Sequence, residues 1–218
     1  MVNARATHAP IGKGMYTFSD IDELFGLKKG RSYRLLNGKY MRKDVGIYGS
    51  RGYTHVDFLT MIELRVIDAL RKLGVKPKEI QKARTELIKQ GIHHPFADSR
   101  LKTDGGCIIW DDSGVTLEVT SKQTVLKKIM DGLFKQIHFS DKGLAEKFYP
   151  LQDKKTVVVD PRFAFGSPSV AGTRIKTKII HGYFESGWDN AKIASNFGIS
   201  TAAVADAIAY ESRQSKVS

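Results

Sequence analysis

Cysteine is the residue that this sequence has least of. Its 218 residues include only Cys107, so the chain can form no internal disulfide and no zinc site of several cysteines. An apolar core must hold the fold, and the 41% hydrophobic content is sufficient for one. We interpret Cys107 as a packed, buried thiol rather than a nucleophile, because no base can be assigned to it. This composition is typical of a reducing compartment, which favours a cytoplasmic location.

Long apolar runs are also missing. No stretch approaches the roughly 18 uninterrupted apolar residues of a membrane span, and residues 1–15 lack the apolar run of a signal peptide. We therefore expect no association with a membrane, and a flexible tail over residues 1–15.

The patterns that mark catalysis or cofactor binding are missing as well. The glycine-containing segment 166–175 has neither the Walker spacing nor its Gly-Lys-Ser/Thr ending. We find no Ser/His/Asp triad, paired carboxylates or dinucleotide fingerprint, and His93-His94 has no spaced partners for a metal. The sequence thus predicts a protein that is not an enzyme, with no catalytic residue, no cofactor and no metal.

Positive charge is what the chain has in excess. Its 35 Lys and Arg against 23 Asp and Glu leave a net charge of +12. Residues 1–102 hold 20 of these basic residues and 10 of the acidic ones, so most of the excess lies in the first half. Clustered cations favour a polyanionic partner, because binding to a phosphate backbone releases its counterions. Nucleic acid is the partner that this distribution indicates.

The order of elements in the first half supports this interpretation. Capping residues, apolar spacing and glycines predict short helices near 17–25 and 31–36, a basic hairpin over 39–53, and longer helices over 58–73 and 77–90. A helix, a glycine turn, a basic helix and a hairpin follow one another in a winged helix-turn-helix. We expect the second helix and the hairpin to contact DNA.

The stretch from Lys28 to Arg51 carries eight basic residues and one acid, Asp44. Tyrosine hydroxyls and Lys or Arg heads are typical phosphate contacts, and an Arg on the second helix can reach guanine edges in the major groove. A basic surface without a partner is the alternative. Lys82, Arg84 and Lys89 of the fourth helix are interpreted instead as a solvated face. The predicted DNA-binding residues are Lys28, Lys29, Arg31, Ser32, Tyr33, Arg34, Lys39, Arg42, Lys43, Tyr48 and Arg51.

The second half predicts a small antiparallel meander over 100–118, a helix over 122–134 and a short strand over 156–159. After a segment rich in Gly and Pro, the spacing predicts three helices, near 177–186, 189–197 and 201–210, that form a second helix-turn-helix-like unit. The expected fold class is mainly α with small β elements.

Two stretches resemble known families. The elements from Tyr16 to Asp98, with His55-Val56-Asp57-Phe58-Leu59-Thr60-Met61-Ile62-Glu63-Leu64-Arg65 opening the third helix, resemble the winged-helix DNA-binding domain of MerR-type regulators. The string Asp160-Pro161-Arg162-Phe163-Ala164-Phe165-Gly166-Ser167-Pro168-Ser169-Val170-Ala171-Gly172-Thr173-Arg174-Ile175, followed by Gly187-Trp188-Asp189, resembles a small prokaryotic domain of the VapB-type antitoxin family. A β-meander and this domain stand where MerR-type activators have a long dimerising helix and an effector site.

The resemblance implies the antitoxin of a type II toxin-antitoxin pair, which binds its own operator DNA as a repressor and neutralises a PIN-like ribonuclease toxin. Double-stranded operator DNA and this toxin are the expected partners. A homodimer is expected because helix-turn-helix proteins usually read paired half-sites. A stand-alone MerR-like transcription regulator without a toxin, and an adaptor whose second domain binds only protein, remain the alternatives.

The implied division of the chain is a DNA-binding domain over 16–98, a meander with a connecting helix over 99–152 and an antitoxin-like helical domain over 153–218. A nuclease of this kind holds its metal with carboxylates, which a guanidinium can satisfy bidentately. The predicted partner-binding residues are Arg162, Arg174 and Arg213. For Arg174, a bond within its own loop explains the motif almost equally well.

Overall fold

The computed structural model describes residues 15–37, 46–49, 54–104, 106–119 and 123–214. Helices account for most of the regular structure in these residues, and the strands are short and pair in small antiparallel sheets. The expected class, mainly α with small β elements, is therefore confirmed. None of the helices in these ranges is long and apolar enough to cross a membrane.

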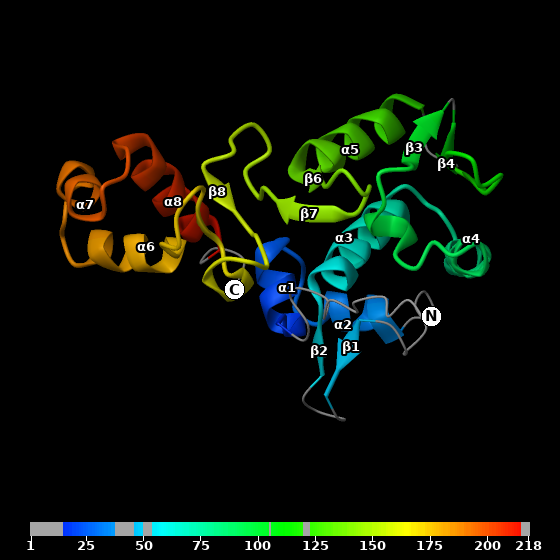
Figure 1. The fold of residues 1–218 in the computed structure, drawn as a ribbon, viewed down its shortest axis with the longest axis horizontal. Coiled ribbons are helices and arrows are strands. Elements are labelled where there is room, and N and C mark those ends of the chain that lie inside the picture. Colours follow the sequence, from blue (N-terminus) through cyan, green and yellow to red (C-terminus); the bar gives the residue numbers. More distant parts are fainter. Residues whose placement is uncertain (1–14, 38–45, 50–53, 105, 120–122, 215–218) are drawn as a thin grey trace, which may run out of the picture.

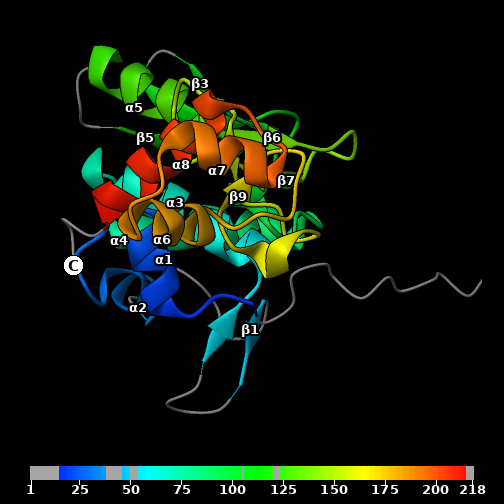
Figure 2. The same ribbon diagram turned by 90° about the vertical axis from the view of Figure 1, so that its left-hand side faces the viewer.

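The first half follows the predicted order of elements, but the second strand of the hairpin lies at residues 55–56, beyond the predicted range of 39–53. Two short helices are followed by a two-stranded sheet that projects from the body of the molecule, and then by two long helices (Figures 1 and 2). The predicted DNA-binding residues Lys39, Arg42, Lys43 and Arg51 lie outside the described residues. The elements are α1 (Phe18–Leu24), α2 (Arg31–Leu35), β1 (Ile47–Tyr48), β2 (His55–Val56), α3 (Phe58–Lys72) and α4 (Pro77–Lys89).

Side-chain caps set the beginning of α1 and α3, and a proline marks the beginning of α4. Thr17 and Asp20 form a reciprocal capping box at α1, and the Asp57 carboxylate accepts from the Thr60 backbone N–H (2.7 Å) at α3. Pro77 begins α4, where its missing N–H costs nothing. Helix α3 is buried on nearly every side, and it forms the centre of the larger apolar cluster.

The middle of the chain packs onto α3. The predicted meander is confirmed as β3 (Leu101–Asp104), β4 (Cys107–Trp110) and β5 (Thr116–Glu118), and the predicted helix as α5 (Gln123–Gln136). A hairpin that the sequence did not predict follows, formed by β6 (Ile137–Phe139) and β7 (Ala145–Phe148). Cys107 is only partly buried, contrary to the expectation of a fully packed thiol.

One apolar cluster spans this region and the first half. It includes residues from Tyr16 to Val159 together with Tyr210, and it continues without a break across the predicted boundary at residue 98. The indole N–H of Trp110 donates to the carbonyl of Pro95 (2.7 Å), inside the cluster. Residues 99–152 thus cover apolar surface of the preceding helices. The domain boundary at residue 98 stays a prediction.

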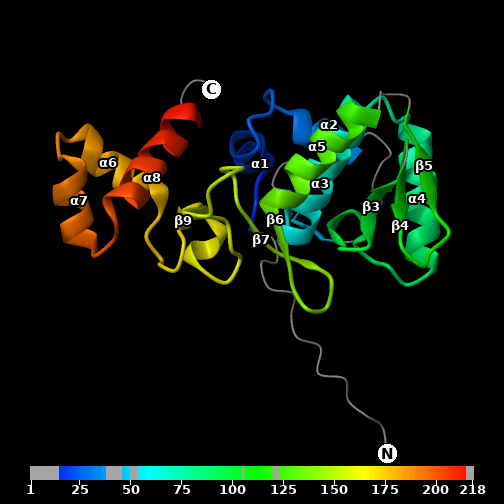
Figure 3. The same cartoon turned by 90° about the horizontal axis from the view of Figure 1, so that it is seen from above.

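The last part begins with the short antiparallel pair β8 (Val157–Val158) and β9 (Ser169–Val170), joined through a 3-10 turn at Ala164–Gly166. The three predicted helices follow as α6 (Thr177–Glu185), α7 (Asn190–Phe197) and α8 (Thr201–Gln214). They gather at one end of the molecule (Figures 1 and 3). They enclose a smaller apolar cluster that includes Ile180, Ile193 and Val204.

Helix α8 connects the two clusters. Its residues Val204 and Ala207 belong to the smaller cluster, whereas Tyr210 belongs to the larger one. Asp206 accepts hydrogen bonds from Lys154 Nζ (2.5 Å) and Thr156 Oγ1 (2.7 Å). The C-terminal helices are therefore attached to the rest of the chain by side-chain contacts as well as by the backbone.

Candidate nucleic-acid and partner-binding sites

A buried carboxylate holds the turn that precedes α2. Asp22 accepts from the backbone N–H groups of Gly30 (2.5 Å) and Ser32 (2.8 Å), and Gly30 adopts a left-handed conformation with φ +73°. Because both N–H groups lie at the start of α2, this carboxylate fixes the orientation of the helix relative to α1.

Ser32, one of the predicted DNA-binding residues, lies inside the protein. Its side chain is fully buried, and its hydroxyl donates to the carbonyl of Phe18 (3.0 Å). The hydroxyl thus joins α2 to α1. In this position it faces away from any surface that DNA could approach.

Arg31 is docked on α3. Its Nε lies 2.9 Å from the buried carboxylate of Asp68, which Lys72 also approaches at 2.8 Å. Burial alone would raise the pKa of Asp68, but the hydrogen bonds and charges of Lys72 and Arg31 outweigh it and hold that pKa below its usual value. About a third of the Arg31 side chain, 35%, stays exposed to solvent.

Four predicted residues form an exposed surface on α2 and the turn before it, here called the α2 surface: Lys28, Lys29, Tyr33 and Arg34. Tyr33 is 54% exposed, and its ring packs edge-to-face with that of Phe18, with centroids 5.3 Å apart. Tyr48, on β1, is partly buried, and burial followed by the charge of Asp57 raises the pKa of its hydroxyl. The α2 surface offers three cations and a phenol, which suits contacts to phosphates and base edges.

The prediction of a solvated face on α4 is wrong for Arg84. Lys82 and Lys89 are exposed, but Arg84 is only 2% exposed and lies 3.4 Å from the fully buried carboxylate of Glu63 on α3. A buried guanidinium needs such a counter-charge, because leaving water would otherwise cost several kcal/mol. Arg84 therefore belongs to the interior and not to a DNA-binding surface.

His94 shares the carboxylate of Glu63. The His94 Nδ1 lies 3.5 Å from Glu63 Oε2, and the backbone N–H of Phe96 donates to Glu63 Oε1 (3.4 Å). Burial lowers the pKa of His94, but Glu63 outweighs burial and raises that pKa above its usual value. We call Glu63, Arg84 and His94 the Glu63 cluster. Within the described ranges, no group of three His, Cys, Asp or Glu side chains is placed to hold a metal ion.

The motif from Gly166 to Ile175 forms a compact elbow between β8 and α6. The backbone N–H of Val170 donates to the carbonyl of Ile175 (2.9 Å), and the Thr173 hydroxyl donates to the carbonyl of Val170 (2.8 Å). The Thr173 hydroxyl also accepts from the backbone N–H of Ile175 (3.1 Å). These bonds close the turn on itself, so the geometry of the loop is accounted for without a ligand.

The residues just before this elbow adopt an unusual conformation. Ala164 and Phe165 are non-glycine residues with positive φ, at +49° and +55°, and Gly166 follows at +68°. A Cβ at Gly166 would lie 2.2 Å from the hydroxyl of Tyr16, so the backbone lies directly against the Tyr16 side chain here. Phe165 is 86% exposed and Phe163 41%. The sequence interpretation missed these aromatics, although Phe163-Ala164-Phe165-Gly166 places two of them beside a glycine.

The three predicted partner-binding arginines differ in their availability. Arg162 binds the Asp160 carboxylate bidentately (Nε–Oδ1 2.9 Å, Nη2–Oδ2 2.7 Å), and its Nη1 donates to Glu146 (2.5 Å). Burial alone raises the pKa of Asp160, but Arg162 outweighs it and holds that pKa below its usual value. Arg174 and Arg213 are exposed. No hydrogen bond or ion pair between described residues joins the three.

Comparison with known proteins relates the chain to an antitoxin-like family. A family described as "Protein of unknown function (DUF433)" matches residues 157–210, from β8 into α8. A Mycobacterium tuberculosis protein named as a candidate antitoxin, VapB45, is 28% identical over 170 residues, which cover 72% of this chain and 71% of that protein. These two matches support the antitoxin-like resemblance.

A solved structure is similar over almost its whole length. The crystal structure of Rv2018 from Mycobacterium tuberculosis has a TM-score of 0.68 and 20% sequence identity, and the match covers 89% of this chain and 97% of that one. At this identity the similarity establishes a shared fold. The arrangement of the larger and the smaller cluster thus has a counterpart in a solved structure.

Proposed function

We propose that this chain is the antitoxin of a type II toxin-antitoxin pair, a non-enzymatic cytoplasmic protein that represses its own operator and neutralises a PIN-like ribonuclease. The observation that carries the proposal is the 28% identity to the antitoxin-named VapB45 over 170 residues. That match extends well beyond the residues 157–210 of the family match, so it includes more than the C-terminal helices. In this proposal the chain acts as a homodimer on paired half-sites.

The α2 surface is the proposed contact with operator DNA. Its Lys28, Lys29 and Arg34 are exposed, whereas the acids nearest to α2 already have internal partners: Asp22 accepts from the backbone, and Asp68 pairs with Arg31. The positive charges on this face therefore remain available to bind the phosphate groups of DNA. Arg34 is the best candidate for a base-edge contact, because it is exposed on α2 and a guanidinium can bind guanine bidentately.

DNA binding is tested with the full chain and a labelled duplex from the promoter of its own gene, by fluorescence anisotropy in about 0.15 M salt. Arg34→Ala should weaken binding by about 1–3 kcal/mol. Lys82→Ala on α4 is the matched control, since it also removes one exposed cation. If both variants bind as tightly as the wild type, the α2 surface is not the interface. If the wild type itself does not bind the promoter, the repressor part of the proposal fails.

Arg174 is the proposed anchor on the nuclease. It is exposed and forms no hydrogen bond or ion pair with the described residues, whereas the guanidinium of Arg162 is occupied by Asp160 and Glu146. A free guanidinium can bind carboxylates that would otherwise hold a divalent metal, and this would inhibit the nuclease without any chemistry. Arg213, exposed near the end of α8, is the second candidate.

Neutralisation is tested by co-expression with the nuclease encoded beside this gene, using growth as the readout. Arg174→Ala should fail to rescue growth, and Lys142→Ala, which removes an exposed cation from the β6–β7 turn, should rescue fully. Full rescue by Arg174→Ala would exclude Arg174 as the anchor. No rescue by the wild type, combined with normal promoter binding, would instead favour a stand-alone transcription regulator.

A further inference from the structure

The stretch from Pro161 to Phe184, here called the acid-free stretch, contains no Asp or Glu. Its Lys and Arg residues are Arg162, Arg174, Lys176 and Lys178. Of the six large hydrophobic side chains that are exposed in the described residues, four lie here: Phe163, Phe165, Ile179 and Phe184. The buried core of a protein interface is typically enriched in aromatic side chains and Arg and depleted in Asp and Glu. The composition of the acid-free stretch is therefore that of a contact surface.

Phe165 is the most exposed of these side chains, at 86%. Both Phe165 and Ala164 before it have a positive φ, at +55° and +49°. A conformation of this kind costs free energy for residues other than glycine. Burial of the ring in its own chain does not offset that cost, because the ring faces solvent. A partner that covers the ring would offset it.

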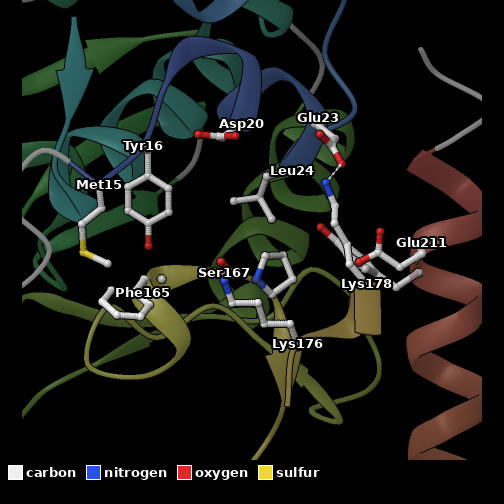
Figure 4. Close-up of a pocket in the computed structure, with 13 residues that line it drawn as sticks. Met15, Tyr16, Asp20, Glu23, Leu24, Phe165, Ser167, Lys176, Lys178 and Glu211 are labelled. Atoms are coloured by element: carbon white, nitrogen blue, oxygen red, sulfur yellow. Dashed lines mark ion pairs between the residues drawn. The ribbon is translucent and has the colours of Figure 1, made fainter. Parts of the chain in front are cut away.

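The loop that carries Phe165 is held from behind. A Cβ on Gly166 would come within 2.2 Å of the Tyr16 hydroxyl, which points toward this loop (Figure 4). A cavity of about 200 Å³ lies between the loop, α1, the start of α6 and the end of α8. Three carboxylates and two ammonium groups line the cavity, so it offers no excess of positive charge. The exposed ring, rather than the cavity, is thus the feature that points to a partner.

A second apolar side chain lies near this ring. The Lys176 ammonium lies 5.9 Å from the centre of the Phe165 ring. Ile179 is 45% exposed and follows Lys176 by three residues, which is the spacing of neighbours on one side of a helix. Phe165 and Ile179 therefore flank Lys176, and Arg174 lies two residues before it. An apolar surface with cations at its edge is the result.

The sign of the charge restricts the kind of partner. Arg162 and Lys178 are paired with acids of other elements, but Arg174 is exposed and has no hydrogen bond or ion pair with any residue that the structure describes. A symmetric contact with a second copy would bring this stretch against itself, and like charges placed opposite each other cost free energy. An acidic protein surface is the partner that complements it.

We propose that Phe165, with Ile179 beside it, is the apolar anchor of the contact with the nuclease, and that the nuclease offers it an apolar pocket bordered by carboxylates. This inference rests on the proposed antitoxin function, and it adds an apolar contact to the one proposed for Arg174. A ring buried at the centre of an interface excludes water from the ion pairs around it, which strengthens their attraction.

The test measures the affinity of the full chain for the purified nuclease encoded beside this gene, by biolayer interferometry. Phe165→Ala should weaken binding about thirtyfold or more, as expected for the central side chain of an interface. The thermal midpoint should not change, because the ring is exposed in the free protein. Val125→Ala, at an exposed apolar residue of α5 outside the acid-free stretch, is the control and should bind like the wild type.

Ile179→Glu and Ile179→Lys test the acidic character of the partner. Both variants remove the same exposed apolar side chain, and they introduce charges of opposite sign. Ile179→Glu should weaken binding about tenfold or more beyond Ile179→Lys, because it places an acid opposite the acids of the nuclease. Equal losses in the two variants would refute an acidic partner surface.

The remaining outcomes separate this contact from the others. Absence of binding by the wild type would overturn the proposed neutralisation and this contact together, whereas unweakened binding by Phe165→Ala would overturn the contact alone. Loss of promoter binding by Phe165→Ala, measured by fluorescence anisotropy, would assign the ring to DNA. Loss of self-association by Phe165→Ala, measured by analytical ultracentrifugation, would assign it to a second copy. Either result would overturn the proposal.

Discussion

The two apolar clusters differ in the kind of side chain that is buried around them. In the larger one, Glu63, Asp68 and Arg84 are each at most 2% exposed, and each has a charged partner. In the smaller one, α6, α7 and α8 meet through apolar side chains such as Ile193 and Val204, and through aromatic rings. The larger cluster therefore depends on charges that must stay paired, and the smaller one on shape.

This difference determines how each cluster responds to substitution. Removing one partner of a buried pair leaves the other charge unsolvated, so the cost is large however small the change in volume. Removing methylene groups from an apolar cluster costs in proportion to the cavity that is left. Substitutions in each cluster should thus separate the two mechanisms.

The largest effect is expected for Arg84→Ala. It leaves the buried Glu63 carboxylate with His94 as its remaining cationic neighbour, so the free energy of unfolding should fall by about 3–5 kcal/mol. Urea unfolding followed by circular dichroism measures this loss. Lys82→Ala, two residues earlier on the exposed face of α4, should change stability by less than about 0.5 kcal/mol. An equally small effect of both would show that the buried pair does not stabilise the larger cluster.

A somewhat smaller effect is expected for Ile193→Ala on α7. Ile193 is fully buried in the smaller cluster, and its truncation should cost about 2–4 kcal/mol. Hydrogen exchange should locate the loss of protection in α6, α7 and α8 and leave α3 unchanged. If α3 loses protection to the same extent, the two clusters unfold as one unit and the comparison between them no longer holds.

Asp206→Asn tests the connection between the clusters, with an expected cost of about 1 kcal/mol. Its carboxylate accepts from Lys154 and Thr156, but the Lys154 side chain is 60% exposed, so solvent screens much of the attraction. Burial raises the pKa of Asp206, but Lys154 and Thr156 outweigh it and lower that pKa. The stabilisation is therefore present above the unfolded-state pKa and is lost as the pH falls through the lower folded-state pKa. In thermal unfolding, the two proteins should differ less at pH 3 than at pH 7.

The smallest effect is expected from His94→Gln. Although burial opposes it, Glu63 raises the pKa of His94, so protonated His94 stabilises the folded state below its usual pKa of 6.5. That stabilisation is lost as the pH rises through the higher folded-state pKa. The wild type should thus lose thermal stability as the pH rises above about 6.5, and the variant should lose less. Identical slopes would show that His94 stays neutral. His93→Gln, at an exposed neighbour, is the control.

The helical spacing of apolar residues predicted much of the fold. The same spacing could have prevented the error at Arg84. Helices α3 and α4 were predicted because apolar residues recur at helical spacing between clear caps. On α4, position 84 falls on the same stripe as Ile80, Ala83 and Leu87. That spacing places the Arg84 side chain inward, where it meets Glu63. The general expectation that Arg is exposed was given more weight than the geometry of the helix.

The β6–β7 hairpin was missed for a different reason. Its turn, Ser140-Asp141-Lys142-Gly143, has ordinary turn chemistry, and Gly143 adopts φ +80°. The flanking strands, however, are three and four residues long, which is too short for an alternating pattern to be recognised. The hairpin depends on packing against the larger cluster, which local sequence does not reveal.

The sequence predicted some features of the candidate sites and missed others. The exposure of Lys28, Lys29 and Arg34 agrees with the charge pattern, but the burial of Ser32 depends on Asp22 and Phe18 of another helix. The cavity beside Tyr16 could not be predicted, because its walls come from opposite ends of the chain. Local patterns predict helices and charged faces, whereas buried pairs and cavities require knowledge of how distant segments meet.

The close approach of Gly166 to Tyr16 has a consequence for the sequences that this fold can tolerate. In a saturation mutagenesis library, position 166 should accept glycine alone, because every other amino acid carries a Cβ that would collide with the Tyr16 side chain. Tyr16→Phe would not relax this restriction, since the ring carbon Cζ would still lie 2.8 Å from that Cβ. Gly172 also has a positive φ, +77°, but a Cβ there meets nothing within 4 Å, so asparagine should be tolerated. Of the two glycines of the motif, one is thus fixed by a contact and the other only by a backbone angle.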